Sequence, residues 1–321
     1  MGVDVKAGVR SLPLRRGPSD PGHGAQPPAC LAVGIATVSR PDLLSLVLDH
    51  LADQTRPADR IIVSAPAPED VAGVAPQLGL EIHIGPRGLT RQRNAIINAA
   101  QGCDILVFFD DDFLPASTYL AAIEHVFAAR EDVVMVTGEV ISDGIIGPGL
   151  DVAEAHRLLQ TGPRDEVTGD GYLWLEEVNN GYGCNMAVRL APARTHDCRF
   201  DEKLPLYGWL EDVDFSRQLG RYGRIVKNPA AWGVHLGIKQ GRQSGMRLGY
   251  SQIANPIYLV RKGTYPWPRA VRLMTRNLGV NCLRSLRPEP YIDRFGRVRG
   301  NLKALSDLVV GKLDPQRILE L

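Results

Sequence analysis

The stretch DILVFFDDDFLP, residues 104–115, joins an apolar run to three consecutive aspartates. Residues 104–109 are typical of a short strand buried in a parallel sheet. Asp110, Asp111 and Asp112 follow directly at the carboxyl end of that strand. Because open parallel sheets bind their ligands at the carboxyl ends of their strands, this stretch indicates both a fold class and the place of a site.

The three adjacent carboxylates suggest a metal ion. Like charges beside a low-dielectric sheet edge repel one another unless a cation neutralises them. Carboxylate oxygens are hard ligands suited to Mg²⁺ or Mn²⁺, and Mg²⁺ also takes phosphate oxygens from a substrate. An acidic turn that caps a helix starting near Pro115 is the alternative, and the stretch alone leaves both interpretations open.

Short apolar runs and helical patterns alternate on the amino-terminal side of this stretch. Strands are predicted over residues 31–38, 60–64 and 81–84, and helices over residues 43–51 and 91–100. This alternation predicts an α/β fold with a Rossmann-like, mostly parallel open sheet flanked by helices. The ends of the first two strands direct attention to Thr37, Arg40 and Ser64 beside the aspartates.

Three segments of different character divide the chain. Residues 1–28 are rich in Pro, Gly and Arg without apolar periodicity, which predicts a flexible arm. Residues 29–240 hold the predicted sheet domain. Residues 241–321 mix apolar residues with Arg and Lys at helical spacing, over residues 245–262, 269–286 and 301–313. This pattern predicts a helical C-terminal extension packed on the sheet domain.

Composition excludes several classes of protein. The 321 residues carry 37 Lys and Arg against 36 Asp and Glu, a balance that argues against nucleic acid as a partner. No apolar run approaches the roughly 20 residues that span a bilayer. The five cysteines are odd in number and never spaced Cys-x-x-Cys, so neither a disulfide framework nor a thiolate zinc site is expected. A reducing, cytoplasmic location suits this pattern.

A second acidic cluster, YGWLEDVDF at residues 207–215, opens an amphipathic helix. Acidic residues in a first turn complement the helix dipole, and a carboxylate near a reacting hydroxyl can also serve as a general base. Trp209 offers a face for stacking a sugar ring, although a buried core position is the commoner place for Trp.

Single polar residues elsewhere carry two interpretations each. His235 follows a predicted strand, where it is either structural or the completing ligand of a metal site made of carboxylates. Arg91 and Arg93 open a helix, where they either improve solubility or contact a diphosphate.

The order of these motifs resembles family 2 glycosyltransferases of the GT-A fold, over about residues 31–262. The ordered series is Arg40-Pro41, Gly88 with Arg93-Asn94, Asp110-Asp111-Asp112, Gly183 to Arg189, Phe200-Asp201-Glu202, Glu211-Asp212-Val213-Asp214 and His235. The resemblance implies transfer of a sugar from a nucleotide diphosphate-sugar to a hydroxyl, with inversion at the anomeric carbon. The acceptor would be a glycan, a polysaccharide or a lipid-linked saccharide.

The resemblance also implies roles for single residues. Asp110 and Asp112 match the outer positions of the family's Asp-x-Asp motif, which binds Mn²⁺ or Mg²⁺, and His235 matches a histidine that approaches the metal. Asp212 matches the aspartate that acts as base. The donor side would include Thr37, Arg40, Ser64, Arg93, Asp110 and Asp111, and the acceptor side would include Asn185, Trp209 and Glu211.

One departure concerns the nucleobase. The family commonly has an aspartate at the end of the second strand, where this chain has Ser64-Ala65-Pro66, so the identity of the nucleotide stays open.

A sugar nucleotidyltransferase is one alternative to a glycosyltransferase, although the loop at residues 36–40 lacks the glycines typical of that class. A non-catalytic nucleotide-sugar-binding protein is another, although binding alone needs no positioned base. The basic C-terminal helices favour core packing on the sheet domain or a homo-oligomer contact, with peripheral membrane contact on the cytoplasmic face as the alternative.

Overall fold

The computed structural model describes residues 11–14, 29–145, 147–163, 173–238 and 244–321. The chain forms two compact units. The sheet unit comprises Met1–Pro86, Gln92–Arg199 and Leu219–Ile238, and the helical unit comprises Arg87–Arg91, Phe200–Gln218 and Lys239–Leu321. Most residues before the predicted boundary near residue 240 belong to the sheet unit, and those after it belong to the helical unit. Residues 87–91 and 200–218 are the exceptions, because they belong with the C-terminal helices.

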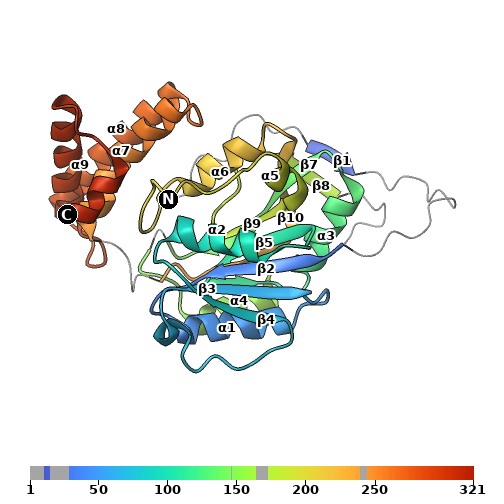
Figure 1. Cartoon of the computed structure of the whole chain (residues 1–321). Helices are drawn as coiled ribbons and strands as arrows, with labels where there is room; N and C mark the ends of the chain where they lie inside the picture. Colours follow the sequence, from blue (N-terminus) through green and yellow to red (C-terminus); the bar gives the residue numbers. More distant parts are fainter. Residues whose placement is uncertain (1–10, 15–28, 146, 164–172, 239–243) are drawn as a thin grey trace. The chain divides into compact units, whose positions relative to one another are not determined.

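The first half of the sheet unit is a parallel sheet (Figure 1). Its strands, in the spatial order β5-β2-β3-β4, are β5 (Ile105–Asp110), β2 (Leu31–Ala36), β3 (Arg60–Ala65) and β4 (Leu80–Ile84). Helices α1 (Pro41–Ala52) and α2 (Leu89–Ala99) lie between them in the chain. The register pairs Ala36 with both Ser64 and Asp110. The carboxyl ends of three strands therefore meet at one edge, as the sequence predicts.

The second half of the sheet is mixed. Its strands are β9 (Asn185–Arg189), β7 (Val133–Asp143), β10 (Arg224–His235), β8 (Leu173–Glu177), β1 (Ser11–Leu14) and the short β6 (Phe113–Pro115). β9 lies antiparallel between β5 and β7, and β7 and β10 are parallel. Of the ten strands in the described residues, only β6, β8 and β9 run against the others. The α/β fold with an open, mostly parallel sheet is confirmed.

Helices cover both faces of the sheet. The side chains of Leu31, Val33 and Ile35 point to one face, where they share a core with α1, α3 (Tyr119–Ala129) and α4 (Val152–Thr161). Gly34 faces the other side, where an added Cβ would lie 2.4 Å from Ile96 Cγ2 of α2. Glycine therefore lets α2 approach β2 closely, and α1 and α2 lie on opposite faces (Figure 1). The short α5 (Leu190–Thr195) follows β9.

The amino-terminal segment differs from its prediction at one place. Ser11–Leu14, inside the predicted flexible arm, pair antiparallel with β8. Pairing with an edge strand satisfies main-chain N–H and C=O groups without any apolar periodicity in the sequence. The remainder of the predicted arm lies outside the described residues.

The helical unit contains α6 (Glu211–Leu219, whose last residue belongs to the sheet unit), α7 (Gly245–Lys262), α8 (Trp267–Ser285), α9 (Arg294–Val309) and the 3-10 turn η2 (Pro315–Glu320). A small core joins α7, α9 and η2 around Tyr250, Ile253, Ala304 and Ile318. Helices form over all three predicted stretches, and α9 begins earlier than predicted, at Arg294. Within the described part of the chain, none of the helices combines the length and apolar character needed to cross a bilayer.

Candidate metal centre

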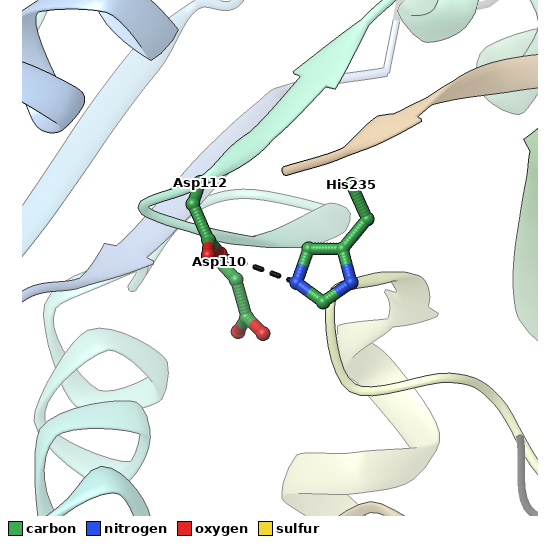
Figure 2. A group of neighbouring side chains, drawn as sticks. All are labelled: Asp110, Asp112 and His235. Atoms are coloured by element: carbon green, nitrogen blue, oxygen red, sulfur yellow. Dashed lines mark ion pairs between the residues drawn. The ribbon is translucent and has the colours of Figure 1, made fainter. Parts of the chain in front are cut away.

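Three predicted ligands come together at the edge of the sheet unit (Figure 2). Asp110 ends β5, Asp112 follows in the turn to β6, and His235 ends β10. β6 pairs antiparallel with β10, opposing Phe113 to His235, and this pairing brings the histidine beside the acidic turn. One ligand atom from each residue lies within 4.8 Å of the others.

His235 is buried between two carboxylates. Its Nε2 lies 3.2 Å from Asp112 Oδ1, and its Nδ1 lies 2.8 Å from Asp143 Oδ1. Burial by itself lowers the pKa of His235, but the hydrogen bonds to Asp112 and Asp143 raise that pKa to about 10. These carboxylates therefore favour the protonated imidazole, and a metal ion that binds Nε2 would take the place of the proton there.

Asp143, which ends β7, fixes the far nitrogen of this histidine. It also accepts hydrogen bonds from Tyr182 Oη at 2.9 Å and from the Ile145 N–H at 3.0 Å. Burial opposes ionisation of Asp143, yet the bond to His235 outweighs it and lowers the pKa of Asp143 to about 2. Asp143 and Tyr182 were not predicted from the sequence. The signal for Asp143 was its position at the carboxyl end of a strand.

Asp112 is tied to the chain that follows β10. Its Oδ2 accepts a hydrogen bond from the Ile238 N–H at 2.9 Å, and its main-chain oxygen accepts one from the Leu236 N–H at 2.9 Å. Burial raises the pKa of Asp112, but the hydrogen bond and charge of His235, with the charge of Arg40, hold that pKa below its usual value. Asp112 is therefore an ionised carboxylate in a fixed orientation.

Asp111, the middle aspartate, faces the β2–α1 turn. Thr37 Oγ1 donates to its Oδ2 at 2.8 Å, and Arg40 Nη1 lies 3.0 Å from its Oδ1. Burial raises the pKa of Asp111 to about 7, although the charge of Arg40 acts against that rise. The structure thus brings Thr37 and Arg40 to the aspartates, as predicted, and Asp111 holds them there.

Arg93 supports Asp110 from inside the protein. Its Nη2 lies 3.0 Å from Asp110 Oδ1 and donates to the Gly183 carbonyl at 2.7 Å. The Arg93 side chain is only 2% exposed, whereas that of Asp110 is 27% exposed. Arg93 therefore orients the most accessible of the three ligands, and its predicted contact with a diphosphate stays a prediction.

Two predicted site residues are buried. The carbonyl of Ser64 accepts hydrogen bonds from Gln92 Nε2 and the Thr37 N–H, and its hydroxyl has no partner among the described residues. Asn185 is 0% exposed within β9, where its Oδ1 accepts from Thr137 Oγ1 at 3.1 Å. The structure does not bring Asn185 to a surface where an acceptor could touch it.

The second acidic cluster belongs to the helical unit. Glu211 and Asp212 are largely buried at the start of α6, and Asp212 Oδ1 accepts from the Val213 N–H at 2.8 Å. Asp214 is fully buried and binds Thr264 Oγ1 at 2.6 Å and Lys262 Nζ at 2.7 Å. Its oxygens are therefore committed to the fold. Trp209 is half-buried, and its carbonyl accepts from Asn255 Nδ2.

The donor set fits a divalent ion that prefers oxygen and nitrogen ligands. Asp110 and Asp112 supply carboxylate oxygens, and the bond between His235 Nδ1 and Asp143 leaves Nε2 facing Asp112. A metal-binding histidine usually has its second nitrogen held by a carboxylate in this way. Mn²⁺ and Mg²⁺ both suit such a set.

Comparison with solved structures identifies the fold as GT-A. The chain is similar to the mannosyltransferase PcManGT from Pyrobaculum calidifontis in complex with GDP-Man and Mn²⁺, with a TM-score of 0.52 and 17% identity over 95% of this chain and 82% of that one. It is also similar to GalNAc-T7 with UDP, GalNAc and Mn²⁺, with a TM-score of 0.53 and 14% identity over 89% of this chain and 59% of that one. No protein-family model and no curated protein matches the chain.

Proposed function

We propose that this protein is a metal-dependent, inverting glycosyltransferase that moves a sugar from a nucleotide diphosphate-sugar to a hydroxyl acceptor. The observation that carries the proposal is the group of Asp110, Asp112 and His235 at the carboxyl edge of a GT-A sheet. The two solved structures described above contain Mn²⁺ with a nucleotide or a nucleotide-sugar, which supports the same class of donor here.

The residues of the sheet unit would hold the donor's diphosphate. Asp110, Asp112 and His235 would bind Mn²⁺ or Mg²⁺, which when bound neutralises phosphate oxygens and stabilises the nucleoside diphosphate that leaves. Asp143 keeps the His235 ring in one orientation, and Arg93 does the same for Asp110. Each ligand is therefore oriented before the donor arrives, which favours tight and specific binding.

We assign proton removal from the acceptor hydroxyl to Asp212, the position that the resemblance gives. Asp214 is unsuited because Lys262 and Thr264 occupy its oxygens. Glu211 is the competing carboxylate, since it lies beside Asp212 in the first turn of α6. The proposed acceptor is a saccharide or a lipid-linked saccharide, with Trp209 as the residue that would stack on a sugar ring.

Release of nucleoside diphosphate from a panel of donors tests this proposal. The whole chain would be incubated with UDP-sugars and GDP-sugars plus simple saccharide acceptors, with Mn²⁺, with Mg²⁺ or with EDTA. We expect release with at least one donor, dependent on the metal, and a product of inverted anomeric configuration by NMR. Both uridine and guanosine donors are needed because Ser64 stands where an aspartate would read the base.

Two outcomes would contradict the proposal. Release of pyrophosphate from a nucleoside triphosphate and a sugar phosphate would indicate a nucleotidyltransferase. Metal-dependent donor binding without any turnover across a broad acceptor panel would indicate a binding protein. Asp307→Asn, in the helical unit and outside both acidic clusters, is the matched control for a carboxylate change that leaves the proposed chemistry intact.

A further inference from the structure

The C-terminal part of the chain is basic, although the whole chain is nearly neutral. Residues 215–288 contain fourteen Lys or Arg and no Asp or Glu, whereas the formal charge of the chain is +1. So long an acid-free segment cannot neutralise its own cations. Its basic residues must find carboxylates from other segments, or they must face solvent or another partner.

Two basic residues of helix α7 bind groups from other segments of the helical unit. Arg247 Nε donates to the Leu321 carbonyl at 2.8 Å, and Lys262 Nζ binds Asp201 at 2.6 Å and Asp214 at 2.7 Å. These cations belong to the interior organisation of the helical unit. Arg261, the third cation of α7, is exposed.

Basic residues of helix α8 instead face solvent. Ala270, Asn277 and Asn281 are its buried residues, and the opposite side carries what we call the α8 face. The α8 face consists of exposed residues on α8 and directly after it: Arg269, Arg272, Arg276, Leu283, Leu286 and Arg287. Among the described residues, Arg269, Arg276 and Arg287 have no carboxylate within ion-pair distance.

The α8 face also exposes large apolar side chains. Leu283 is 71% exposed and Leu286 is 79% exposed. An open hollow of about 570 Å³ lies over Gly279, lined by side chains of α8 alone. Arginine stems and leucines therefore alternate on one surface that no described part of the chain covers.

We propose that the α8 face docks on an anionic lipid surface. Guanidinium groups bind phosphate headgroups, while leucine side chains enter the boundary between headgroups and acyl chains. A second copy of the chain is a poorer occupant, since a symmetric contact would oppose arginines to arginines. Nucleic acid would satisfy the arginines and leave Leu283 and Leu286 in water. This inference does not rest on the proposed enzymatic function.

Vesicle binding by the whole chain tests the proposal. Vesicles of phosphatidylcholine alone and with about 30% phosphatidylglycerol would be floated on a density gradient at low and high salt. We expect binding only to the anionic vesicles, weakened by salt because screening shortens the reach of the charges. Each arginine near an anionic surface strengthens binding about fivefold. The triple variant R269Q/R276Q/R287Q should therefore bind on the order of 100-fold more weakly.

A matched triple variant controls for net charge. R157Q/K203Q/R221Q removes three exposed cations away from α8 and should retain vesicle binding. A third variant, L283S/L286S, should weaken vesicle binding while leaving retention on a heparin column unchanged, because heparin offers charge without an apolar phase. Circular dichroism melting would confirm that all three variants fold.

The proposal is overturned by any of four results. These are no flotation with anionic vesicles at low salt, equal losses in the two triple variants, equal binding of L283S/L286S and the unaltered protein, or a dimer in sedimentation that R269Q/R276Q/R287Q dissociates. Binding of single-stranded RNA that depends on the α8 face, without vesicle binding, would assign that face to nucleic acid instead.

Discussion

The sheet edge and the helical unit bury charge in different ways. In the helical unit two buried acids each meet their own cation and hydroxyl: Asp214 meets Lys262 and Thr264, and Asp307 meets Lys303 and Tyr250. At the sheet edge, three adjacent aspartates share two arginines and one histidine. Matched pairs stabilise a fold without needing a ligand, whereas a concentrated, partly open set of carboxylates is suited to binding a cation.

The strongest test of this contrast is Asp112→Asn against Asp307→Asn. Asp112→Asn removes one of three metal ligands, so we expect Mn²⁺-dependent turnover to fall by at least about 100-fold and nucleotide binding in Mn²⁺ to weaken. Chelation by EDTA should do the same to the unaltered protein. Asp307→Asn should lower the free energy of unfolding and leave turnover per folded molecule unchanged. Donor affinity that neither Asp112→Asn nor EDTA alters would contradict the metal assignment.

The next largest effect is expected at Asp212. A general base acts in the transition state, so Asp212→Asn should lower kcat by about 10²–10⁴-fold and leave donor binding largely unchanged. Steady-state kinetics with a calorimetric measurement of donor affinity would separate the two quantities. Glu211→Gln is the matched control in the same helical turn. Near-normal turnover in Asp212→Asn together with a large loss in Glu211→Gln would assign the base to Glu211.

Local sequence patterns predict the parallel half of the sheet and two of the three ligands. The run at residues 104–109 marks a buried strand because apolar side chains leave water on both faces of a parallel sheet. Asp110 and Asp112 follow in the same stretch, so a single motif carries them. His235 lies more than a hundred residues away, and only pairing of β6 with β10 brings it to the site. The local pattern left His235 open between a structural role and a metal ligand, and the family resemblance favoured the metal ligand.

Other features depend on contacts that the sequence pattern does not encode. Asp143 reaches His235 through the register of β7 and β10, and Tyr182, in the loop before β9, reaches Asp143 by a hydrogen bond. Arg93 looks like an exposed helix-opening arginine, yet it is buried against Asp110 and Gly183. Residues 200–218 join the helical unit because of such contacts, for example the bonds of Lys262 to Asp201 and Asp214.

A smaller effect is expected at Asp143, the carboxylate bonded to His235 Nδ1. Asp143→Asn replaces the charged partner of His235 Nδ1, so the ring loses its fixed orientation and Mn²⁺ affinity should fall about 10–100-fold. Calorimetric titration of Mn²⁺ into the donor-free protein measures this directly, and saturating Mn²⁺ should restore most of the turnover. Tyr182→Phe removes one hydrogen bond from Asp143 and should have a milder effect. Unchanged Mn²⁺ affinity in Asp143→Asn would show that His235 needs no such support.

The smallest expected effect is on the stability of the helical unit, with no change in Mn²⁺ affinity. Gly249 of α7 lies against α9, where an added Cβ would meet the Arg297 carbonyl oxygen at 2.1 Å, and main-chain atoms cannot move aside as a side chain can. Gly249→Ala should therefore destabilise the helical unit by about 1–3 kcal/mol. Gly279 of α8 has no such neighbour within 4 Å, so Gly279→Ala should stabilise the protein by about 0.5–1 kcal/mol through helix propensity alone.

Urea denaturation followed by circular dichroism compares the two alanine variants, and titration with Mn²⁺ shows whether the sheet edge is affected. We expect opposite shifts of the unfolding midpoint and the same Mn²⁺ affinity, because both glycines belong to the helical unit and all three ligands belong to the sheet unit. Equal stability of the two variants would mean that α7 and α9 can separate without loss. A change in Mn²⁺ affinity in Gly249→Ala would mean that packing in the helical unit controls the metal ligands, which would break the contrast between the two regions.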